Sequence, residues 1–321
     1  MIRLEGVAKT YDDGTEAVTG LDLEVPANSL VTLVGPSGCG KSTILKMVNR
    51  LIEPTAGRIY LDGADVTHAD PVRLRRGIGY VIQQVGLFPH QKVLANVTTV
   101  PRLVGWDAAR ARERGLELME LVGLDPDTFA DRYPHQLSGG QRQRVGVARA
   151  LAADPPVLLM DEPFGAVDPV VRARLQDEFL KVQRELHKTV LMVTHDVDEA
   201  VKMGDRVAVF ADGGRLAQYD VPATVLGAPA DEFVAEFVGG SRGIKRLAVT
   251  RIDPALLESL DGVHAGELGG TIEVSATLEE AMALMMREDR PMVGVTDRAR
   301  FLGVLTPNGV HAMLRASVRG G

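Results

Sequence analysis

The sequence has little cysteine and lacks long apolar runs. Cys39 is the single cysteine among 321 residues, so an intramolecular disulfide cannot form and we expect a reducing compartment such as the cytosol. The first residues lack the apolar segment of a signal peptide, and no stretch approaches the roughly 18 apolar residues that a membrane-spanning helix needs. We therefore expect any membrane role to come through a partner protein.

An excess of positive charge is also missing. The formal net charge is −7, whereas nucleic-acid binders usually carry a basic face that displaces counterions from phosphates, so no nucleic-acid partner is expected. Hydrophobic residues at 45% and charged residues at 25% are typical of a soluble globular protein. The length predicts an α/β domain of roughly two hundred residues or more with a small appendage.

Short apolar strands alternate with helical patterns from Met1 to about Val238. The clearest strands are Leu30–Val34, Val157–Met160, Val190–Val193 and Val207–Phe210, and their alternation with helices predicts a largely parallel sheet covered by helices. Strand patterns stop between about residues 86 and 154. Because Ala108–Val122 has helical spacing there, we predict an inserted helical subdomain. The small polar stretch Gly239–Gly243 then suits a linker, so we predict domains at 1–240 and 241–321.

The C-terminal part shows a new pattern. Thr271–Val274 is strand-like, and Thr277 with Glu280 forms the S/T-x-x-E pattern of a capping box at the start of a helix. Met292–Thr296 and Phe301–Leu305 suit two strands, and Thr306 followed by Pro307 predicts a last helix. The expected order is β-α-β-β-α, which describes a small α+β domain.

A phosphate-binding loop is predicted between Leu30–Val34 and the helical run Thr43–Leu51. The loop fits G-x-x-x-x-G-K-[ST] with Gly35, Pro36, Ser37, Gly38, Cys39, Gly40, Lys41 and Ser42. Glycines let the backbone curl so that its N–H groups and the helix N-terminus point at the phosphates of ATP. Lys41 adds a positive charge, and the Ser42 hydroxyl can ligate Mg²⁺.

Two acidic residues end the apolar run Val157–Met160. A buried strand would deliver Asp161 and Glu162 to the carboxyl edge of the sheet, where open α/β sheets bind ligands. We expect Asp161 to hold the Mg²⁺ shell and Glu162 to orient or deprotonate the attacking water, because phosphoryl transfer depends on positioning and charge neutralisation. Without the upstream loop, the pair could equally be ordinary acids at a strand end.

A second glycine-rich helix start follows Leu137. It consists of Ser138, Gly139, Gly140 and Gln141 and precedes the helical pattern of residues 142–152. Such a start can bind anions through its free N–H groups and helix dipole. The alternative is an ordinary serine N-cap.

Together these motifs resemble the ATP-binding cassette (ABC) family over residues 1–240. The resemblance implies a P-loop NTPase fold that pairs head to tail, so that Ser138 and its neighbours in one copy close on the ATP held by the other. It also implies an ATP site that includes Thr43 and an aromatic contact to adenine by Tyr11, for which a turn residue is the alternative. Gln83 and His195 match catalytic positions of this family, and Gln83 also matches a position that contacts Mg²⁺. Gln84 offers a second register for Gln83, and a satisfied polar group is the alternative for His195. Asp168 matches the dimer-contact loop.

The stretches 78–90, 100–106 and 233–239 resemble the glycine betaine, carnitine and choline importers of this family. That resemblance implies ATP-driven uptake of an osmoprotectant through separate transmembrane permease subunits at the cytoplasmic face of the membrane. An extracytoplasmic solute-binding protein would act indirectly. A soluble ABC-type ATPase outside transport, a nucleotide sensor without turnover and a motor for another solute class are the alternatives.

The C-terminal part resembles one CBS repeat, a regulatory module that usually occurs as a pair. We therefore expect the C-terminal parts of two chains to pair. The adenosine-binding form of the module often ends in T-x-x-D, whereas Thr306 is followed three positions later by Gly309, so nucleotide binding there is not expected. A purely packing or dimerising role is the alternative.

Overall fold

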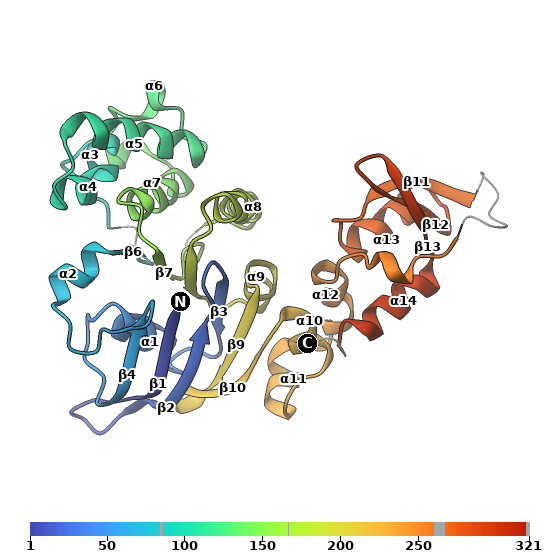
Figure 1. Cartoon of the computed structure of the whole chain (residues 1–321), viewed down its shortest axis with the longest axis horizontal. Coiled ribbons are helices and arrows are strands. Elements are labelled where there is room, and N and C mark those ends of the chain that lie inside the picture. The colour runs from blue at the N-terminus through green and yellow to red at the C-terminus, as the bar shows by residue number, and fades with distance from the viewer. Residues whose placement is uncertain (84–85, 166, 260–266, 319–321) are drawn as a thin grey trace. The chain divides into compact units, whose positions relative to one another are not determined.

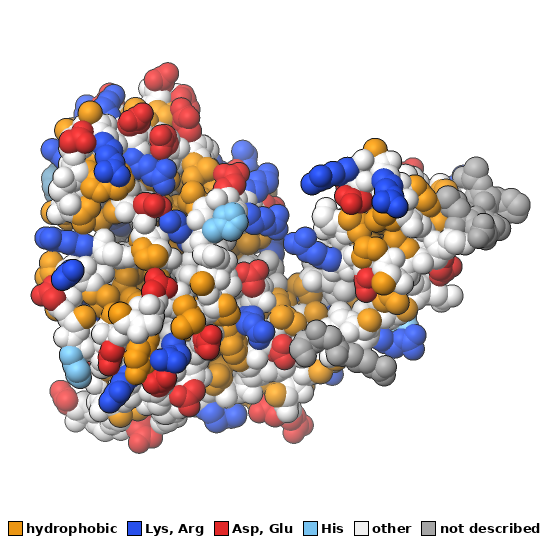
Figure 2. Space-filling view, in the orientation of Figure 1, with side chains coloured by type: hydrophobic (Ala, Val, Ile, Leu, Met, Phe, Trp, Pro, Cys, Tyr) orange, Lys and Arg blue, Asp and Glu red, His pale blue; other side chains and the backbone are white. Residues whose placement is uncertain are grey.

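The computed structural model describes residues 1–83, 86–165, 167–259 and 267–318 (Figure 1). Contacts between residues divide the chain into two compact units, an N-terminal unit over Met1–Leu216 and a C-terminal unit over Ala217–Gly321. Within the described residues, no helix combines the length and the apolar character that crossing a membrane requires. Acidic and basic side chains are interspersed over the visible surface of the N-terminal unit (Figure 2).

The larger sheet has the strand order β10-β9-β3-β8-β7-β6. Its strands are β3 (Leu30–Val34), β6 (Ile78–Val81), β7 (Val157–Asp161), β8 (Thr189–Val193), β9 (Arg206–Ala211) and β10 (Arg215–Asp220). The pairs that β3 makes with β8 and β9, and that β7 makes with β6 and β8, are all parallel. Every residue of β3 and β8 is buried, as expected for strands covered on both faces. The predicted parallel α/β core is confirmed.

A separate antiparallel sheet was not foreseen from the sequence. Its order is β2-β1-β4-β5, with β1 at Ile2–Thr10, β2 at Glu16–Val25, β4 at Ala56–Leu61 and β5 at Ala64–Asp65. The pairing of β1 with β2 shifts register between Leu4 and Val7, where Gly6 has a φ of 57°. This irregularity breaks the alternation of apolar and polar residues by which an antiparallel strand is recognised in a sequence.

The helices of residues 86–154 lie together at one side of the N-terminal unit (Figure 1). They are α3 (Val93–Val97), α4 (Thr99–Leu103), α5 (Ala108–Leu121), α6 (Pro126–Phe129), the 3₁₀ turn η1 (Pro134–Gln136) and α7 (Gly139–Leu151). Val97 of α3, Leu118 of α5 and Val145 of α7 are fully buried in one apolar cluster. The remaining helical elements of the unit are α1 (Lys41–Val48), α2 (Pro71–Arg76), α8 (Pro169–Leu186), α9 (Val197–Met203) and η2 (Asp212–Gly214).

The C-terminal unit contains a three-stranded sheet with helices around it. Its elements are α10 (Pro222–Gly227), α11 (Glu232–Val238), α12 (Arg242–Val249), η3 (Pro254–Leu256), β11 (Leu268–Glu273), α13 (Leu278–Arg287), β12 (Met292–Asp297), β13 (Arg300–Leu305) and α14 (Pro307–Ala316). β11 and β12 run parallel, and β12 and β13 run antiparallel. The Thr277 hydroxyl accepts from the N–H of Glu280 at 3.2 Å, and that of Thr306 accepts from Gly309 at 3.0 Å. Both predicted helix caps and the order β-α-β-β-α are therefore present.

The stretch 239–243, which the sequence analysis interpreted as a linker, is a short corner between two helices. Gly239 has a φ of 81° directly after α11, and α12 begins at Arg242. α12 packs against α10 within the C-terminal unit. Glycine suits the corner because its positive φ is costly for residues that carry a Cβ. The domain boundary at 240 stays a prediction.

Candidate functional site

The predicted site residues of the larger sheet all follow the carboxyl ends of neighbouring strands. The glycine-rich loop follows β3, His195 follows β8, Glu162 follows β7 and Gln83 follows β6. These strands are consecutive in the sheet order, β3-β8-β7-β6, and parallel. Segments that are far apart in the sequence therefore meet at one edge, which is where open parallel sheets bind ligands.

The loop after β3 fits tightly against its surroundings at two glycines. A Cβ on Gly35 would lie 2.3 Å from the carbonyl oxygen of Phe210, and a Cβ on Gly40 would lie 2.1 Å from that of Ala17. Gly40 also has a φ of 95° and immediately precedes α1. Glycine at these positions is therefore required by the backbone path, which brings the loop to the N-terminus of α1.

The ammonium group of Lys41 lies inside the curl of this loop. Its Nζ donates to the carbonyl oxygens of Gly35 at 2.8 Å and Pro36 at 2.7 Å, and lies 3.5 Å from the Cys39 sulfur. Lys41 is only 6% exposed, and its hydrogen bonds in this loop go to carbonyl oxygens and a sulfur rather than to a carboxylate. A buried ammonium beside a helix N-terminus makes the loop suitable for an anion such as a phosphate group.

Ser42 and Asp161 connect the loop to the end of β7. The Ser42 hydroxyl donates to Asp161 Oδ1 at 2.9 Å. Burial raises the pKa of the Asp161 carboxyl above its ordinary value, and the hydrogen bond from Ser42 opposes this shift. Burial, together with the charge of Asp161, raises the pKa of Tyr80 to about 12, which keeps that neighbouring phenol neutral. A partly buried carboxylate beside a hydroxyl oxygen provides the hard oxygen donors that Mg²⁺ prefers.

The side chains of Gln83 and His195 both approach the Glu162 carboxylate. Gln83 Nε2 donates to Glu162 Oε2 at 2.8 Å, and His195 Nδ1 lies 3.3 Å from the same oxygen. Glu162 has a φ of 45°, a left-handed conformation that is uncommon for a residue other than glycine. Its own N–H donates to the carbonyl oxygen of Val193 at 3.0 Å, which fixes this backbone against β8. The Glu162 carboxylate, at the end of β7, is thus contacted by groups that follow the two neighbouring strands β6 and β8.

Tyr11 lies beside the start of α1. Its hydroxyl is 3.3 Å from the Thr43 hydroxyl, and the residue is 38% exposed. Lys9 Nζ lies 5.3 Å from the ring centroid, a distance that allows a cation–π interaction. The partly exposed ring is therefore available to stack on a flat ligand next to the loop.

Ser138 begins α7 through a reciprocal pair of hydrogen bonds. Its hydroxyl accepts from the N–H of Gln141 at 3.2 Å, while Gln141 Oε1 accepts from the N–H of Ser138 at 2.9 Å. The serine N-cap is therefore present, although it does not exclude anion binding. Among the described residues, no hydrogen bond or ion pair joins this motif to the Lys41 loop or to Glu162.

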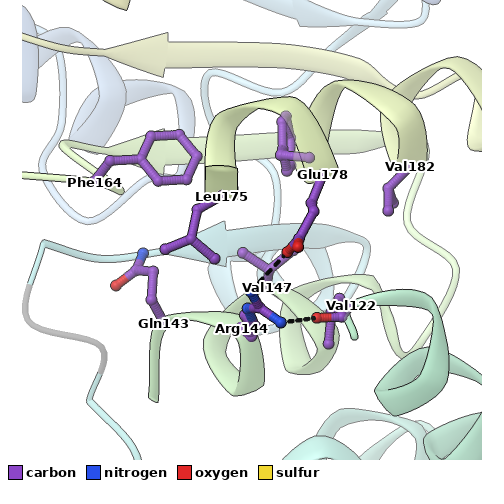
Figure 3. Close-up of a pocket in the computed structure, with 9 residues that line it drawn as sticks. Val122, Gln143, Arg144, Val147, Phe164, Leu175, Glu178 and Val182 are labelled. Carbon is purple, nitrogen blue, oxygen red and sulfur yellow. Dashed lines mark hydrogen bonds and ion pairs between the residues drawn. The ribbon is translucent and has the colours of Figure 1, made fainter. Parts of the chain in front are cut away.

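Arg144 fastens this helix to its neighbours (Figure 3). Its guanidinium donates to the carbonyl oxygens of Val122 and Gly123 at 3.3 and 3.0 Å, and lies 2.9 Å from Glu178 of α8. Under this ion pair is a mainly apolar cavity of about 30 Å³. Phe164, two positions after Glu162, lines the cavity. The orientation of α7 is therefore coupled to both α5 and α8.

Asp168 caps the start of α8 and does not contact Glu162 or Lys41 in any hydrogen bond or ion pair of the described residues. Its Oδ1 accepts from the N–H groups of Val170 and Val171 at 3.2 Å each. Val167 is buried. Val170 is 82% exposed. The loop thus presents an apolar side chain beside a carboxylate on the surface of the unit.

Some contacts near His195 were not anticipated from the sequence. Asp196 caps α9 by accepting from the N–H groups of Asp198 and Glu199 at 2.8 and 3.2 Å, and its carboxylate lies 3.6 Å from Arg172. The aspartate before the apolar run of α9 is a recognisable helix-start signal. Its pairing with Arg172 joins distant segments and has no local signal. Gln84, the alternative to Gln83, lies outside the described residues.

Several known proteins are similar to this chain in sequence. The family profile described as "ABC transporter" matches residues 18–165. The Choline transport ATP-binding protein OpuBA of Bacillus subtilis (strain 168) is 49% identical over 290 residues, which cover 90% of this chain and 73% of that protein. The Glycine betaine/carnitine/choline transport ATP-binding protein OpuCA of the same strain is 47% identical over 302 residues, covering 94% and 77%.

Solved structures are also similar. The dimeric structure of MJ0796, a bacterial ABC transporter cassette, has a TM-score of 0.63 and is 36% identical, covering 69% of this chain and 99% of that chain. A dimeric post-hydrolysis state of the same cassette, bound to ADP and Pi, has the same TM-score at 35% identity, with the same coverage.

Proposed function

Because this chain belongs to the ABC transporter family of ATP-binding proteins, we propose that it is the ATP-hydrolysing subunit of an importer for an osmoprotectant or related quaternary amine. It works as a pair of identical copies and drives separate membrane-spanning permease subunits from the cytoplasmic face. A solute-binding protein outside the membrane delivers the solute and contacts this subunit only through the permease. The solute class rests on the names of the relatives, because this subunit does not touch the solute.

The observation that carries the proposal is the connected set of contacts at the strand ends. Ser42 joins the loop to Asp161, and the next residue, Glu162, receives Gln83 and faces His195. Such an arrangement provides what phosphoryl transfer requires, namely a cradle for phosphates, oxygen ligands for a metal ion and a carboxylate for water. An ordinary set of strand-end acids would have no reason to converge with a glycine-rich loop.

ATP is expected to bind between Tyr11 and the loop from Gly35 to Thr43. The loop N–H groups face the phosphates, and the Lys41 ammonium leaves its carbonyl partners to contact them. The Tyr11 ring stacks on the adenine base. The oxygens of Ser42, Asp161 and Gln83 fit Mg²⁺, which neutralises charge on the phosphates when bound. In support, the raised pKa of Asp161 reflects a buried carboxyl that a cation would stabilise in its charged form.

Glu162 acts on the water that attacks the terminal phosphate. Its carboxylate orients this water and accepts its proton, while Gln83 and His195 hold the side chain in position. His195 also contacts the terminal phosphate. Its ring must therefore face both the Glu162 carboxylate and that phosphate. The strained backbone of Glu162 is consistent with such a role, because strain tends to be retained at functional sites.

The site is completed by a second copy of the chain. Ser138, Gly139, Gly140 and Gln141 at the start of α7 approach the terminal phosphate held by the other copy, and the Asp168 loop contacts that copy. Two features support this proposal. The motif makes no hydrogen bond or ion pair with its own Lys41 loop among the described residues, and similar cassettes have been solved as dimers.

The test of this function is the dependence of ATP hydrolysis on subunit concentration. The rate per subunit should fall as the protein is diluted, because each site needs residues from two copies. The variant Glu162→Gln should lose about 10²-fold or more of its ATPase activity, as expected when a general base is removed. It should form a stable dimer with ATP by size-exclusion chromatography. A rate that is independent of dilution, or full activity in the variant, would contradict the proposal.

Reconstitution identifies the transported class. We expect the purified subunit, with its permease and solute-binding protein in vesicles, to drive accumulation of radiolabelled glycine betaine, choline or carnitine in the presence of ATP. Uptake of sugars or methionine alone would indicate a motor for another solute class. ATPase stimulation by nucleic acid rather than by permease would indicate a role outside transport.

The C-terminal domain, which we place at 241–321, is proposed to act as a single CBS-like regulatory module that pairs with that of another copy. Its β-α-β-β-α order and the caps at Thr277 and Thr306 support this proposal. Gly309 stands where the adenosine-binding form has an acidic residue, so we do not propose a nucleotide there. Pairing predicts that chains ending before α10 dimerise more weakly than the full chain in analytical ultracentrifugation.

A further inference from the structure

We propose that Arg172 is a positioning residue that connects the Asp168 loop to the His195 segment, so that docking of the second copy is communicated to Glu162. The inference rests on the proposed function, in which the Asp168 loop meets the other copy and Glu162 acts on water. It assigns a role to a contact between α8 and α9 that lies outside the nucleotide-binding motifs.

The guanidinium of Arg172 contacts one residue next to each of the two segments. Its NH2 donates to the carbonyl oxygen of Val167 at 3.1 Å, and its NH1 lies 3.6 Å from Asp196 Oδ2. Val167 directly precedes Asp168, and Asp196 directly follows His195. A single planar group with several donors can hold two acceptors at fixed separation, which a lysine ammonium does less well.

Further contacts hold α8 and α9 together beyond Arg172 and Asp196. Gln176 Nε2 donates to Glu199 Oε1 at 2.9 Å, and both side chains are buried. Lys202 Nζ lies 2.8 Å from Asp177 Oδ1. Burial raises the pKa of the Glu199 carboxyl, and hydrogen bonds from Thr194 and Gln176 oppose the shift. The two helices therefore contact each other at several positions. The contact made by Arg172 is the one nearest to the Asp168 loop and the His195 segment.

His195, which directly precedes Asp196, connects this segment to the Glu162 carboxylate. His195 Nδ1 lies 3.3 Å from Glu162 Oε2. On the other side, the Asp168 carboxylate accepts from the first N–H groups of α8, the helix that carries Arg172. A displacement of the Asp168 loop would therefore move the Val167 carbonyl that accepts from Arg172. It would also move the start of α8, the helix that carries Arg172.

The exposure of the pair indicates a geometric role. The side chains of Arg172 and Asp196 are 25% and 35% exposed, and 3.6 Å is longer than a hydrogen bond. Ion pairs of this kind add little to folding stability because water screens them. Loss of Arg172 should therefore leave the fold intact while changing how well His195 is placed.

The first experiment compares Arg172→Met with Arg174→Met in the full chain. Arg174 lies on the same helix but is mostly exposed and contacts Glu178, so it is a matched control. We expect Arg172→Met to lower kcat about tenfold, with the KM for ATP and nucleotide affinity at high dilution changed less than about twofold. Arg174→Met should behave as the unmodified chain. Equal effects of the two substitutions would overturn the proposal.

Conservative variants separate positioning from folding. Arg172→Gln can still donate to the Val167 carbonyl but lacks the charge for Asp196, so we expect a fall in kcat with an unchanged unfolding temperature. Arg172→Lys keeps the charge and should recover part of the lost rate. If Arg172→Met unfolds, these two variants still decide the question. A normal kcat in Arg172→Gln would contradict the role of the pair.

A double-mutant cycle with Asp196→Asn tests whether the two residues act together. Asparagine keeps an oxygen for capping α9 but loses the charge that faces Arg172. We expect Arg172→Gln, Asp196→Asn and the double variant to lose kcat by similar factors, because residues in one contact are non-additive. Multiplied losses would show that the residues act independently and would overturn the proposal.

These outcomes distinguish the inference from the function on which it rests. Failure of the unmodified chain to bind ATP, or hydrolysis independent of dilution, contradicts the proposed function. Normal, dilution-dependent hydrolysis in the unmodified chain, together with normal kcat in Arg172→Gln, contradicts only the role of Arg172.

Discussion

Ser42 Oγ donates a hydrogen bond to Asp161 Oδ1 at 2.9 Å, although 119 positions separate these residues in the sequence. The contact joins the loop after β3 to the end of β7 without passing through the intervening strand β8. It therefore fixes the distance between the two oxygens that would share a metal ion. Desolvation at this position destabilises the charged form of Asp161 and so raises the pKa of its carboxyl.

Replacement of Asp161 by asparagine should stabilise the nucleotide-free protein while strongly reducing ATP turnover. An acid whose pKa is higher in the folded than in the unfolded chain binds more protons when folded, so its contribution to stability falls as pH rises above about 3.8. Asp161→Asn removes this penalty and can still accept from Ser42. We expect its free energy of unfolding to exceed that of the unmodified chain at pH 7 by more than at pH 4, with ATPase reduced about 10²-fold or more.

Urea unfolding without nucleotide at the two pH values measures this effect. Asp154→Asn is a control of opposite sign, because the hydrogen bond from Lys188 lowers the pKa of Asp154. Asp154 thus contributes stability above its unfolded pKa and loses it in acid, so the control should be destabilised at pH 7. A destabilised Asp161→Asn at neutral pH would refute the argument.

Replacement of Lys41 by methionine should weaken ATP binding. The ammonium is the charge that the loop offers to phosphates, and charge-assisted hydrogen bonds are among the strongest available. We expect at least about a tenfold loss of affinity for a fluorescent ATP analogue, measured at a subunit concentration low enough to prevent dimers. Lys181→Met on the exposed face of α8 is the control. Equal affinity in the two variants would exclude Lys41 from the binding site.

Replacement of Gly40 by alanine should destabilise the fold far more than replacement of Gly63. Both residues have positive φ, at 95° and 82°, so both substitutions incur backbone strain of about 1 kcal/mol. A Cβ on Gly40 would additionally lie 2.1 Å from the Ala17 carbonyl oxygen, whereas nothing lies within 4 Å of one on Gly63. We expect a difference of about 2 kcal/mol or more between the variants in urea unfolding. Similar losses would show that the loop relaxes freely.

Replacement of Arg144 by methionine should loosen the start of α7. The guanidinium contacts two backbone carbonyls and Glu178 and is largely buried, so we expect a loss of about 2 kcal/mol in unfolding free energy. Arg114→Met is the control, since Arg114 forms an ion pair with Glu117 three positions away on α5. Such pairs contribute about 0.5 kcal/mol or less. A loss in Arg144→Met no greater than in the control would contradict this role.

The sequence predicted the parts of the site that have a local pattern. Lys41 was found because a strand, a glycine-rich loop and a helix follow one another, and Glu162 because apolar residues precede two acids. Gln83 and His195 have no such pattern, and they were assigned only through the family resemblance. Their convergence on Glu162 depends on strand order, which a single sequence does not specify.

The parts of the fold that were missed also have physical reasons. Gly6 interrupts the alternation of β1, so the antiparallel sheet lacks the signal on which its prediction depends. The polar stretch 239–243 has the composition of a linker, yet packing of α12 against α10 makes it a corner. The contact between Arg172 and Asp196 joins two helices that are separated by β8, and no local rule predicts it.

The packing of α12 against α10 also affects how the chain can be divided. A cut after residue 240 would retain Val225 and Leu226, which are almost fully buried, but would remove the helix that packs on theirs. Arg246 of α12 also donates to the carbonyl oxygen of Leu314 in α14, so α12 contacts elements on both sides of residue 240. Proteolytic fragments and shortened chains should therefore remain soluble more readily when the break precedes α10.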